Sequence, residues 1–525
     1  MPATRSRGVW ATAQSSMERM EVEYDPYLPF AEIIAGHARR HPDKEAIFSI
    51  AENRGLTYGE LSRTTNRVAA ALRSRGIGAG DRVLVLAGNG LAMVTAYLGI
   101  LRHGATVCTV NVETNAAHLA EIANAVAPRL ALFESDRDLA GPVGQASGES
   151  MRLDEFLDAL PDAAMSNDAP CVCGPEDHAV IFYTSGTEAR PKGVIYSHAS
   201  LFFNFDSVAD MIGLRADDRV LEFRSLSWIS AQQLGLGAPL VRGATAFIAE
   251  RFSRGRFLEW IRDHDIDIAA CVPAGISMLL NEPVTLRGSD LPRLRFITSS
   301  SAPLLVEQWR AFEACYGIAI VQGYGMSEAG WITGSDRDNR RHGTVGRPVK
   351  HQRVRVLDEA GRNLPPGETG EIEASGDRQQ SLGYLLSDGT IRRMPVGGVR
   401  TGDLGYLDDD GYLHVTGRAK DLIIRGGVNI APLEIDGVIS ELAEIAEACT
   451  VGVPDPIYGE EVVSYVTLKT GAYLTGEEIR AHCAARLPDL KTPKEIVIRV
   501  SLPRTARGKL DRNALAEDWR GIDGT

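Results

Sequence analysis

Apolar and polar positions along this chain switch between helical and strand spacing for most of its length. Thr57 and Glu60 have the spacing of a helix capping box, and apolar residues on one helical face follow them. Short apolar runs at residues 82–86 and 105–110 predict strands on either side of a helix at 91–101. Helices and strands that alternate in this way predict a mostly parallel sheet covered by helices on both faces. The predicted fold class is therefore α/β.

The pattern continues beyond residue 180, where three predicted strands end in polar segments rich in glycine or serine. These segments are 184–187, 299–303 and 323–328. Because ligands of open α/β sheets bind beyond the carboxyl ends of the strands, the three segments are candidates for one site. The strands before them are predicted at 179–183, 294–298 and 318–322, with further strands at 219–223 and 245–248 and a helix at 201–211.

From about residue 345, short apolar runs separated by turn signals replace the alternation of helix and strand. The run Asp408-Asp409-Asp410-Gly411 predicts a hairpin tip rather than a metal site, because Tyr-Leu pairs flank it on both sides. Beyond Gly417 the pattern predicts a small α+β domain. Its predicted elements are a helix near 432–442, strands at 448–453 and 462–468, and a helix introduced by Thr475 and Glu478.

Composition narrows the class of protein. The chain has 525 residues, too many for a single core, so we expect two or more domains. Its net charge of −13, without a long basic run, argues against nucleic acid or an anionic membrane as the main partner. Seven scattered cysteines predict a reducing cytoplasm, and we expect Cys171 and Cys173 to be structural because no second pair of zinc ligands follows them. No apolar run reaches the roughly 18 residues of a membrane span, and no apolar core follows Arg5 and Arg7 as in a signal peptide.

The segment 184–193 joins small hydroxyl and glycine residues to a basic end. Ser, Thr and Gly allow backbone N–H groups to approach an anion closely, and Arg190 and Lys192 add positive charge. The segment is therefore predicted to hold a polyphosphate, although the Walker sequence G-x-x-x-x-G-K-[ST] is absent.

This segment and four later ones, in order, resemble the motifs of the adenylate-forming superfamily of acyl-CoA synthetases, peptide-synthetase adenylation domains and luciferases. The phosphate loop of that family reads T-S-G-T-T-G-x-P-K-G, and the chain departs from it at Glu188 and Ala189. A carboxylate beside phosphates is repulsive, so we expect Glu188 to point away or to help hold Mg²⁺. Ala189 is less free at positive φ than glycine. The other matches are Y-G-x-[ST]-E at 324–328, R-T-G-D at 400–403, the hinge region at 417–421 and P-[RK]-x-x-x-G-K at 503–509.

The resemblance spans about residues 28–515 and implies a role for each matching position. Lys509, Glu328 and Ser327 would be catalytic, with Glu328 as the Mg²⁺ ligand. The nucleotide would be bound by Thr184, Ser185, Gly186, Thr187, Lys192, Ser301, Ala302, Tyr324, Asp403 and Arg418. The acyl pocket would include Trp228, Ile229, Gly323, Met326 and Trp331, the path of coenzyme A would pass Gly426 and Gly427, and Lys420 would be the hinge.

The resemblance also implies an architecture and a reaction. We expect an N-terminal extension at 1–27, a large domain of α/β layers with a small β-barrel-like subdomain at 28–417, a hinge at 418–421 and a small mobile α+β domain at 422–525. A carboxylate would attack the α-phosphorus of MgATP to give an acyl-adenylate and pyrophosphate, and the thiol of coenzyme A would then displace AMP. The protein would supply positioning and charge neutralisation rather than a nucleophile of its own.

The acid and its acceptor are less closely defined. Amino-acid-activating domains have an aspartate where Ile229 stands, and an apolar residue cannot balance a buried ammonium, so amino-acid substrates are disfavoured. We expect a small- to medium-chain or aryl acid, and free coenzyme A as the acceptor because no carrier domain follows Thr525. Two alternatives stay open: an adenylating enzyme that passes its product to a carrier protein or other nucleophile, and a non-catalytic nucleotide-binding relative. The oligomeric state also stays open, with a homodimer among the alternatives.

Overall fold

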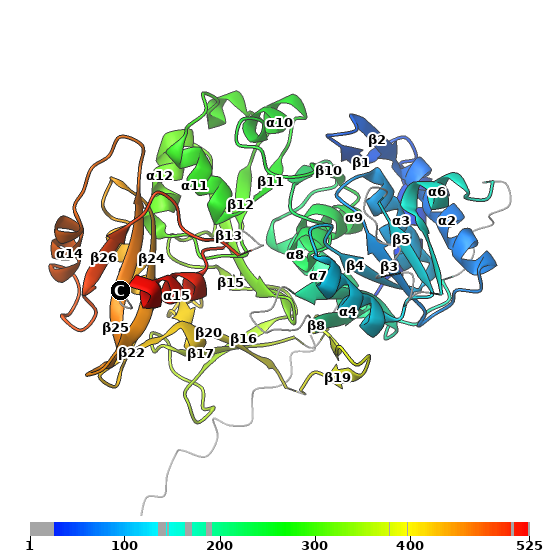
Figure 1. Ribbon diagram of the computed structural model, residues 1–525. Helices are drawn as coiled ribbons and strands as arrows, with labels where there is room; N and C mark the ends of the chain where they lie inside the picture. The colour runs from blue at the N-terminus through cyan, green and yellow to red at the C-terminus, as the bar shows by residue number, and fades with distance from the viewer. Residues whose placement is uncertain are drawn as a thin grey trace, which may run out of the picture.

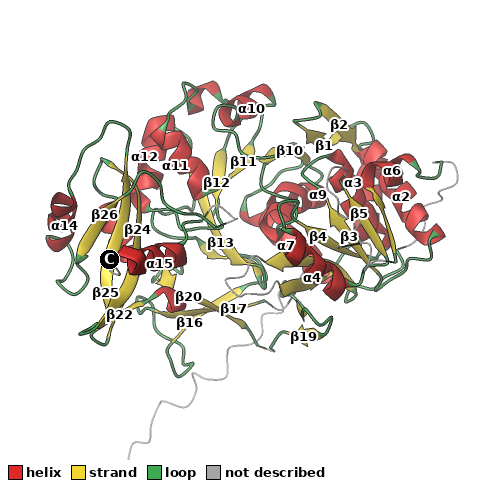
Figure 2. Cartoon of the chain, in the orientation of Figure 1, coloured by secondary structure: helices red, strands yellow, loops and turns green. Residues whose placement is uncertain are grey.

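The computed structural model describes residues 26–134, 148–162, 171–184, 192–376, 378–395, 397–505 and 509–522, together with residues 143 and 146. Figure 1 shows two large sheets with α7 (His198–Met211), α8 (Ile229–Ala231) and α9 (Ala238–Arg242) between them, and a smaller unit at the C-terminal end. This arrangement confirms the predicted α/β class with a separate small α+β domain. Figure 2 shows the same layers by type of element. The exact domain boundaries remain predictions.

One large sheet has the strand order β19-β18-β8-β7-β4-β3-β5-β6. Its centre is parallel, as predicted, and β7 pairs with β8 in the antiparallel direction. The apolar side chains of its central strands are almost fully buried. Its strands are β3 (Arg82–Leu86), β4 (Thr106–Val110), β5 (Leu130–Phe133), β6 (Glu149–Arg152), β7 (His178–Thr184), β8 (Lys192–Ser197), β18 (Gly383–Leu385) and β19 (Ile391–Arg393).

The other large sheet has the order β15-β14-β13-β12-β11-β9-β10-β1-β2. Strand β13 differs from its prediction, because it continues through 323–326 instead of ending at 322. It does so because these residues pair with β14 in the antiparallel direction. The strands are β1 (Glu45–Ser49), β2 (Arg54–Thr57), β9 (Arg219–Glu222), β10 (Thr245–Ile248), β11 (Ile268–Cys271), β12 (Phe296–Ser299), β13 (Ile320–Met326), β14 (Gly330–Gly334) and β15 (Arg347–Pro348).

Capping boxes mark the starts of α2 and α7 beside the large sheets. The predicted capping box of Thr57 and Glu60 is formed at the start of α2 (Tyr58–Ser74). A second box, Ser197 with Ser200, starts α7, which packs against β7, β8 and β14 and so joins the two large sheets. The remaining helices around these sheets are α1 (Phe30–Arg40), α3 (Leu91–His103), α4 (Ala116–Val126), α6 (Leu153–Asp158), the π-helix η2 (Gln232–Gly237), α10 (Phe257–Asp263), α11 (Pro273–Asn281), the 3₁₀ turn η3 (Gly288–Asp290) and α12 (Val306–Tyr316).

An antiparallel sheet with the order β16-β17-β20-β21 forms the predicted β subdomain. The Asp408–Asp410 segment is a hairpin tip, as predicted, and the Asp408 N–H donates to the carbonyl of Tyr412. The carboxylate of Asp408 also accepts from the N–H groups of Asp410 and Tyr412, which accounts for the acidic turn without a metal. The strands are β16 (Arg353–Leu357), β17 (Gly370–Ser375), β20 (Val399–Leu407) and β21 (Leu413–Arg418).

The C-terminal unit has its own sheet, β23-β22-β25-β24, with β26 added beside β25. Two small apolar cores cover its faces. The predicted capping box of Thr475 and Glu478 starts α14. Its elements are η4 (Ala419–Asp421), β22 (Ile423–Arg425), β23 (Val428–Ile430), α13 (Pro432–Ile439), β24 (Ile445–Asp455), β25 (Gly459–Leu468), α14 (Gly476–Ala484), β26 (Glu495–Ile498) and α15 (Arg512–Ile522).

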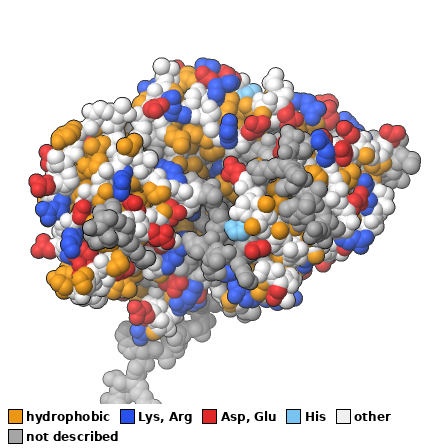
Figure 3. Space-filling model, in the orientation of Figure 1, with side chains coloured by type: hydrophobic (Ala, Val, Ile, Leu, Met, Phe, Trp, Pro, Cys, Tyr) orange, Lys and Arg blue, Asp and Glu red, His pale blue; other side chains and the backbone are white. Residues whose placement is uncertain are grey.

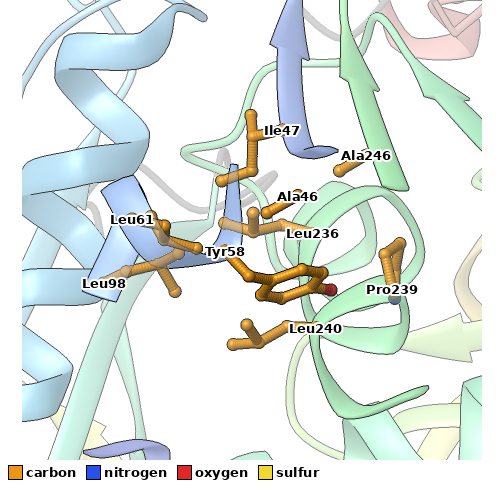
Figure 4. A pocket seen from close by; sticks show the side chains of 9 residues that line it. All are labelled: Ala46, Ile47, Tyr58, Leu61, Leu98, Leu236, Pro239, Leu240 and Ala246. Carbon is orange, nitrogen blue, oxygen red and sulfur yellow. The ribbon is translucent and has the colours of Figure 1, made fainter. Parts of the chain in front are cut away.

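Two features of the fold bear on where ligands can bind. The cavity in Figure 4 lies between α2 and α9 and has a volume of about 10 Å³, so it has room for about one water molecule. Its lining is apolar, and the hydroxyl of Tyr58 donates to the carbonyl of Ala244, so this cavity is a packing gap.

Among the described helices, none is long and apolar enough to cross a membrane.

Candidate active site

Asp403 is the point at which three separate elements of the chain meet. It lies on β20, its neighbour Arg418 pairs with it across the hairpin from β21, and Tyr324 reaches it from β13. The Tyr324 hydroxyl donates to Oδ2 of Asp403 at 2.7 Å, and Nε of Arg418 donates to Oδ1 at 2.7 Å. Asp403 is 6% exposed, so this carboxylate is fixed in position before any ligand arrives. Burial, followed by the Asp403 charge, raises the pKa of Tyr324, which keeps its hydroxyl a donor.

Glu328 and Ser327 follow β13 and are held by two tyrosines that the sequence did not single out. The Tyr384 hydroxyl on β18 donates to Oε1 of Glu328 at 3.0 Å. The Tyr196 hydroxyl on β8 donates to the carbonyl of Ser327 at 2.7 Å. The Glu328 carbonyl accepts from the N–H of Ser381. The Glu328 segment is therefore tied to the strand that follows the phosphate loop.

The structure places the two ends of the phosphate loop, whose residues 185–191 lie outside the described part of the chain. β7 and β8 pair in the antiparallel direction, and Thr184 lies opposite Lys192. The loop therefore begins at the carboxyl end of β7, where anionic ligands of α/β sheets bind. The expectations for Ser185, Gly186, Thr187, Glu188 and Ala189 lie outside the described residues.

The segment after β12 contains a strained residue at a predicted nucleotide-binding position. Ser301 has a φ of 74°, a left-handed conformation that is uncommon for residues other than glycine. Such conformations gather at ligand sites, where the surrounding fold maintains them. Ala302 is half-buried next to it, and Ser300 before it is buried.

The predicted acyl-pocket residues divide into two groups. Trp228 is half-buried and caps α8, and Ile229 is buried as the first residue of that helix. Trp331, by contrast, is 3% exposed and lies in the core between α7 and the sheet. Its ring lies over Gly323, where an added Cβ would come within 1.8 Å of Cζ3. Met326 is half-buried at the end of β13.

The predicted hinge and coenzyme A positions lie on the C-terminal unit. Lys420 is exposed in η4, the 3₁₀ turn that follows Arg418. Gly426 and Gly427 form the exposed turn between β22 and β23, with φ values of 58° and 83°. Both glycines need positive φ, so side chains there would be strained as well as obstructive. Lys509 is exposed, and its carbonyl accepts from the N–H of Thr505, while residues 506–508 lie outside the described part.

Glu328 suits a magnesium ion by its chemistry. Mg²⁺ prefers carboxylate oxygens, retains several waters and binds through one or two carboxylates plus substrate phosphates. The Tyr384 hydroxyl donates to Oε1 of Glu328, and the residue is half-buried. Within the described ranges, no group of three or more His, Cys, Asp or Glu side chains could hold a metal ion. The sulfur atoms of Cys171 and Cys173 lie 3.0 Å apart and contact each other.

A cleft of about 320 Å³ separates the C-terminal unit from the large domain near α12 and α13. Three carboxylates line it: Glu307, Glu434 and Glu441. Two of these carboxylates are paired with cations, Glu434 with Lys491 at 2.7 Å and Glu441 with Arg486 at 2.8 Å. On the face shown in Figure 3, acidic and basic side chains of the described residues are intermixed instead of forming one basic patch.

Comparisons with known proteins identify the family. The profile of AMP-binding enzymes matches residues 34–385, and that of the AMP-binding enzyme C-terminal domain matches residues 434–509. Sulfoacetate–CoA ligase from Cupriavidus necator is 36% identical over 510 residues, which cover 93% of this chain and 98% of the relative. Oxalate–CoA ligase from Arabidopsis thaliana is 30% identical over 502 residues, or 92% of this chain and 97% of the relative.

The same holds for solved structures. ATP-bound MatB from Rhodopseudomonas palustris has a TM-score of 0.85 at 28% identity, over 94% of this chain and 99% of that one. The chain therefore belongs to the AMP-binding enzyme family, the acyl-CoA synthetases of the adenylate-forming superfamily, as its motifs predicted.

Proposed function

We propose that this enzyme joins a short, polar carboxylic acid to coenzyme A in two half-reactions, with AMP and pyrophosphate as products. The observation that carries the reaction is the Asp403 cluster, because a buried carboxylate beside an aromatic ring and an arginine suits a ribose, an adenine and a phosphate. Sulfoacetate– and oxalate–CoA ligases, the relatives named above, support the same reaction class.

In the first half-reaction, an oxygen of the acid attacks the α-phosphorus of ATP and pyrophosphate leaves. Asp403 accepts hydrogen bonds from the ribose hydroxyls, Tyr324 stacks on adenine and Arg418 reaches the ribose and phosphates. Lys509 neutralises the charge that develops at the α-phosphate. A magnesium ion held by Glu328 supplies charge neutralisation at the phosphates when bound. Ser327 contacts the α-phosphate, and Ser301, with its left-handed backbone, and Ala302 contact the nucleotide beside it.

In the second half-reaction, the thiolate of coenzyme A attacks the acyl carbon and AMP leaves. The exposed turn at Gly426 and Gly427 would contact the pantetheine arm, because backbone without side chains permits close approach. Lys509 and this turn lie on the same small domain, and the family resemblance implies that each enters the site in one half-reaction. Rotation at Lys420, between domains at 28–417 and 422–525, would exchange Lys509 for the Gly426–Gly427 turn in the site.

The acid is proposed to be short and polar because of the residues of the predicted acyl pocket. The ring of Trp331 fills the space that a side chain at position 323 would occupy, so this predicted pocket position stays a glycine. The relatives named above, sulfoacetate– and oxalate–CoA ligases, support a short acid. The loop that carries Trp228 has half-buried hydroxyl groups at Ser225 and Ser230, and that of Ser225 also bonds to the Ser227 hydroxyl at 2.7 Å. Hydroxyls favour a substrate with a second hydrogen-bonding group over a long alkyl chain.

Other properties are proposed at a coarser level. Free coenzyme A is the proposed acceptor, and a carrier protein is the alternative. The cytoplasm is the proposed compartment, because the seven cysteines are scattered and those among the described residues are free thiols.

One screen tests both parts of the proposal. Pyrophosphate release would be measured with oxalate, sulfoacetate, hexanoate and benzoate, with and without coenzyme A. AMP and a thioester should form with coenzyme A, whereas ADP and phosphate would contradict the adenylate mechanism. The short polar acids should give the highest kcat/KM. Trp228→Ala should extend activity to bulkier acids, and an unchanged profile would place Trp228 outside the pocket.

A further inference from the structure

A completely buried ion pair lies beside the loop that carries Trp228. Glu222, the last residue of β9, and Arg224 have side chains that are 0% and 2% exposed. Nε and Nη2 of Arg224 donate to the two carboxylate oxygens at 2.9 and 2.6 Å, which is a bidentate arrangement. Oε1 of Glu222 also accepts from the N–H groups of Phe223 and Arg224. Both charges are therefore neutralised within the protein.

The remaining bonds of Arg224 extend beyond this pair to two other segments. Nη1 donates to the hydroxyl of Ser300 at 3.0 Å, directly before the strained residue Ser301. Nη2 donates to the carbonyl of Ser230 at 3.2 Å, at the far end of the Trp228 loop. Arg224 thus joins the start of this loop, its end and the segment that follows β12.

Asn89 holds the same loop from the other side. Its Nδ2 donates to the carbonyl of Arg224 at 2.9 Å, and its Oδ1 accepts from the N–H of Leu226 at 2.8 Å. Residues 224–230 are consequently anchored at both ends. Because Trp228 is half-buried within this anchored loop, its position depends on the two anchors.

We propose that Arg224 is a positioning residue for the acid: its guanidinium fork fixes the Trp228 loop against Ser300 and so sets the shape of the acyl pocket. This inference rests on the proposed function. A buried ion pair contributes little net stability compared with apolar side chains of similar size. Its fixed geometry is therefore the better account of why two charges lie in this position, and lysine, a point charge without the fork, cannot reproduce it.

Arg224→Lys is the main test, with Arg295→Lys as the matched control. Arg295 donates to Asp218 at 2.7 Å and joins the opposite ends of β9 and β12, away from the site. Steady-state kinetics would be measured with oxalate, sulfoacetate, hexanoate and benzoate. Arg224→Lys should raise the KM of the preferred acid by at least about tenfold and change the KM of ATP by less than about threefold. Arg295→Lys should leave both KM values unchanged while lowering the Tm.

Two further variants keep the test decisive. Ser300→Ala removes one bond of Arg224 and should raise the KM of the acid by a smaller factor. Glu222→Gln combined with Arg224→Met removes both charges, so it should fold even where a single replacement does not, and it should show the same selective rise in the KM of the acid. Equal changes in the KM of acid and ATP, or none in either, would overturn the positioning role. Absence of pyrophosphate release by the parent enzyme with every acid would instead overturn the proposed function.

Discussion

Replacing Asp403 with asparagine isolates the charge at the centre of the site. The change keeps size and shape but converts charged hydrogen bonds to neutral ones. A hydrogen bond to a charged group contributes about 1.5–3 kcal/mol and a neutral one about 0.5–1.5 kcal/mol, so each ribose hydroxyl should lose about 1 kcal/mol. Two ribose hydroxyls give about 2 kcal/mol, or about a 30-fold rise in the KM of ATP. Because the Arg418 side chain is 47% exposed, solvent screens its pair with Asp403 and the loss of stability should be small.

The assay is pyrophosphate release at saturating acid, with ATP varied. Asp218→Asn is the matched control, because Asp218 is also a buried carboxylate paired with an arginine. It lies just before the first residue of β9, on a different strand from Asp403. That control should lower the Tm and leave the KM of ATP unchanged. A KM for ATP within about threefold of the parent value in Asp403→Asn, or a rise in the KM of the acid instead, would refute the assignment of the ribose to Asp403.

Three further predictions concern other groups. Lys509→Ala should slow acyl-adenylate formation by roughly 10²–10³-fold but spare thioester formation from preformed adenylate. A bulky residue at Gly427 should slow thioester formation and spare adenylate formation. Single-turnover kinetics of each half-reaction would show this, and equal slowing of both half-reactions by Lys509→Ala would contradict separate roles. Tyr384→Phe should weaken Mn²⁺ binding by the ATP complex about tenfold, because Glu328 loses the hydrogen bond from the Tyr384 hydroxyl. Electron paramagnetic resonance titrations would measure this, and unchanged binding would show that the bond does not position the carboxylate. Burial lowers the pKa of His198 to about 4, so protonation below the ordinary histidine pKa favours the unfolded state. The free energy of unfolding should therefore fall by about 3 kcal/mol between pH 6.5 and 4. His198→Gln should reduce that fall in denaturant titrations, and identical pH profiles for parent and variant would exclude His198 as its cause.

The sequence predicted those parts of the fold that depend on neighbouring residues. The capping boxes at Thr57 and Thr475 need only two side chains three positions apart, and both form. The parallel centre of the first sheet follows from the alternation of apolar runs. The continuation of β13 to Met326 was not predicted, because it depends on pairing with β14 and not on the residues of β13 themselves.

The candidate site was predicted as separate motifs, and the structure adds their contacts. Nothing in the spacing of Tyr324, Asp403 and Arg418 shows that their side chains meet; only the resemblance implied it. Tyr384 and Tyr196 could not be found by such reasoning, because each lies outside any motif. They reach Glu328 and Ser327 through the pairing of β18 with β8, which joins segments remote in sequence.

The ion pair of Glu222 and Arg224 is different, because a local signal for it was present. Glu222 is the last residue of β9, and Arg224 follows two positions later, beyond the strand. Here they carry opposite charges in a run whose other residues, Val220, Leu221 and Phe223, are apolar and buried. Because a buried charge must be paired, the two opposite charges of this run are a local signal for an ion pair, although not for its bidentate geometry. What it could not supply was the third partner, Ser300, because β11 lies between β9 and β12 and the strand order is set by the whole sheet.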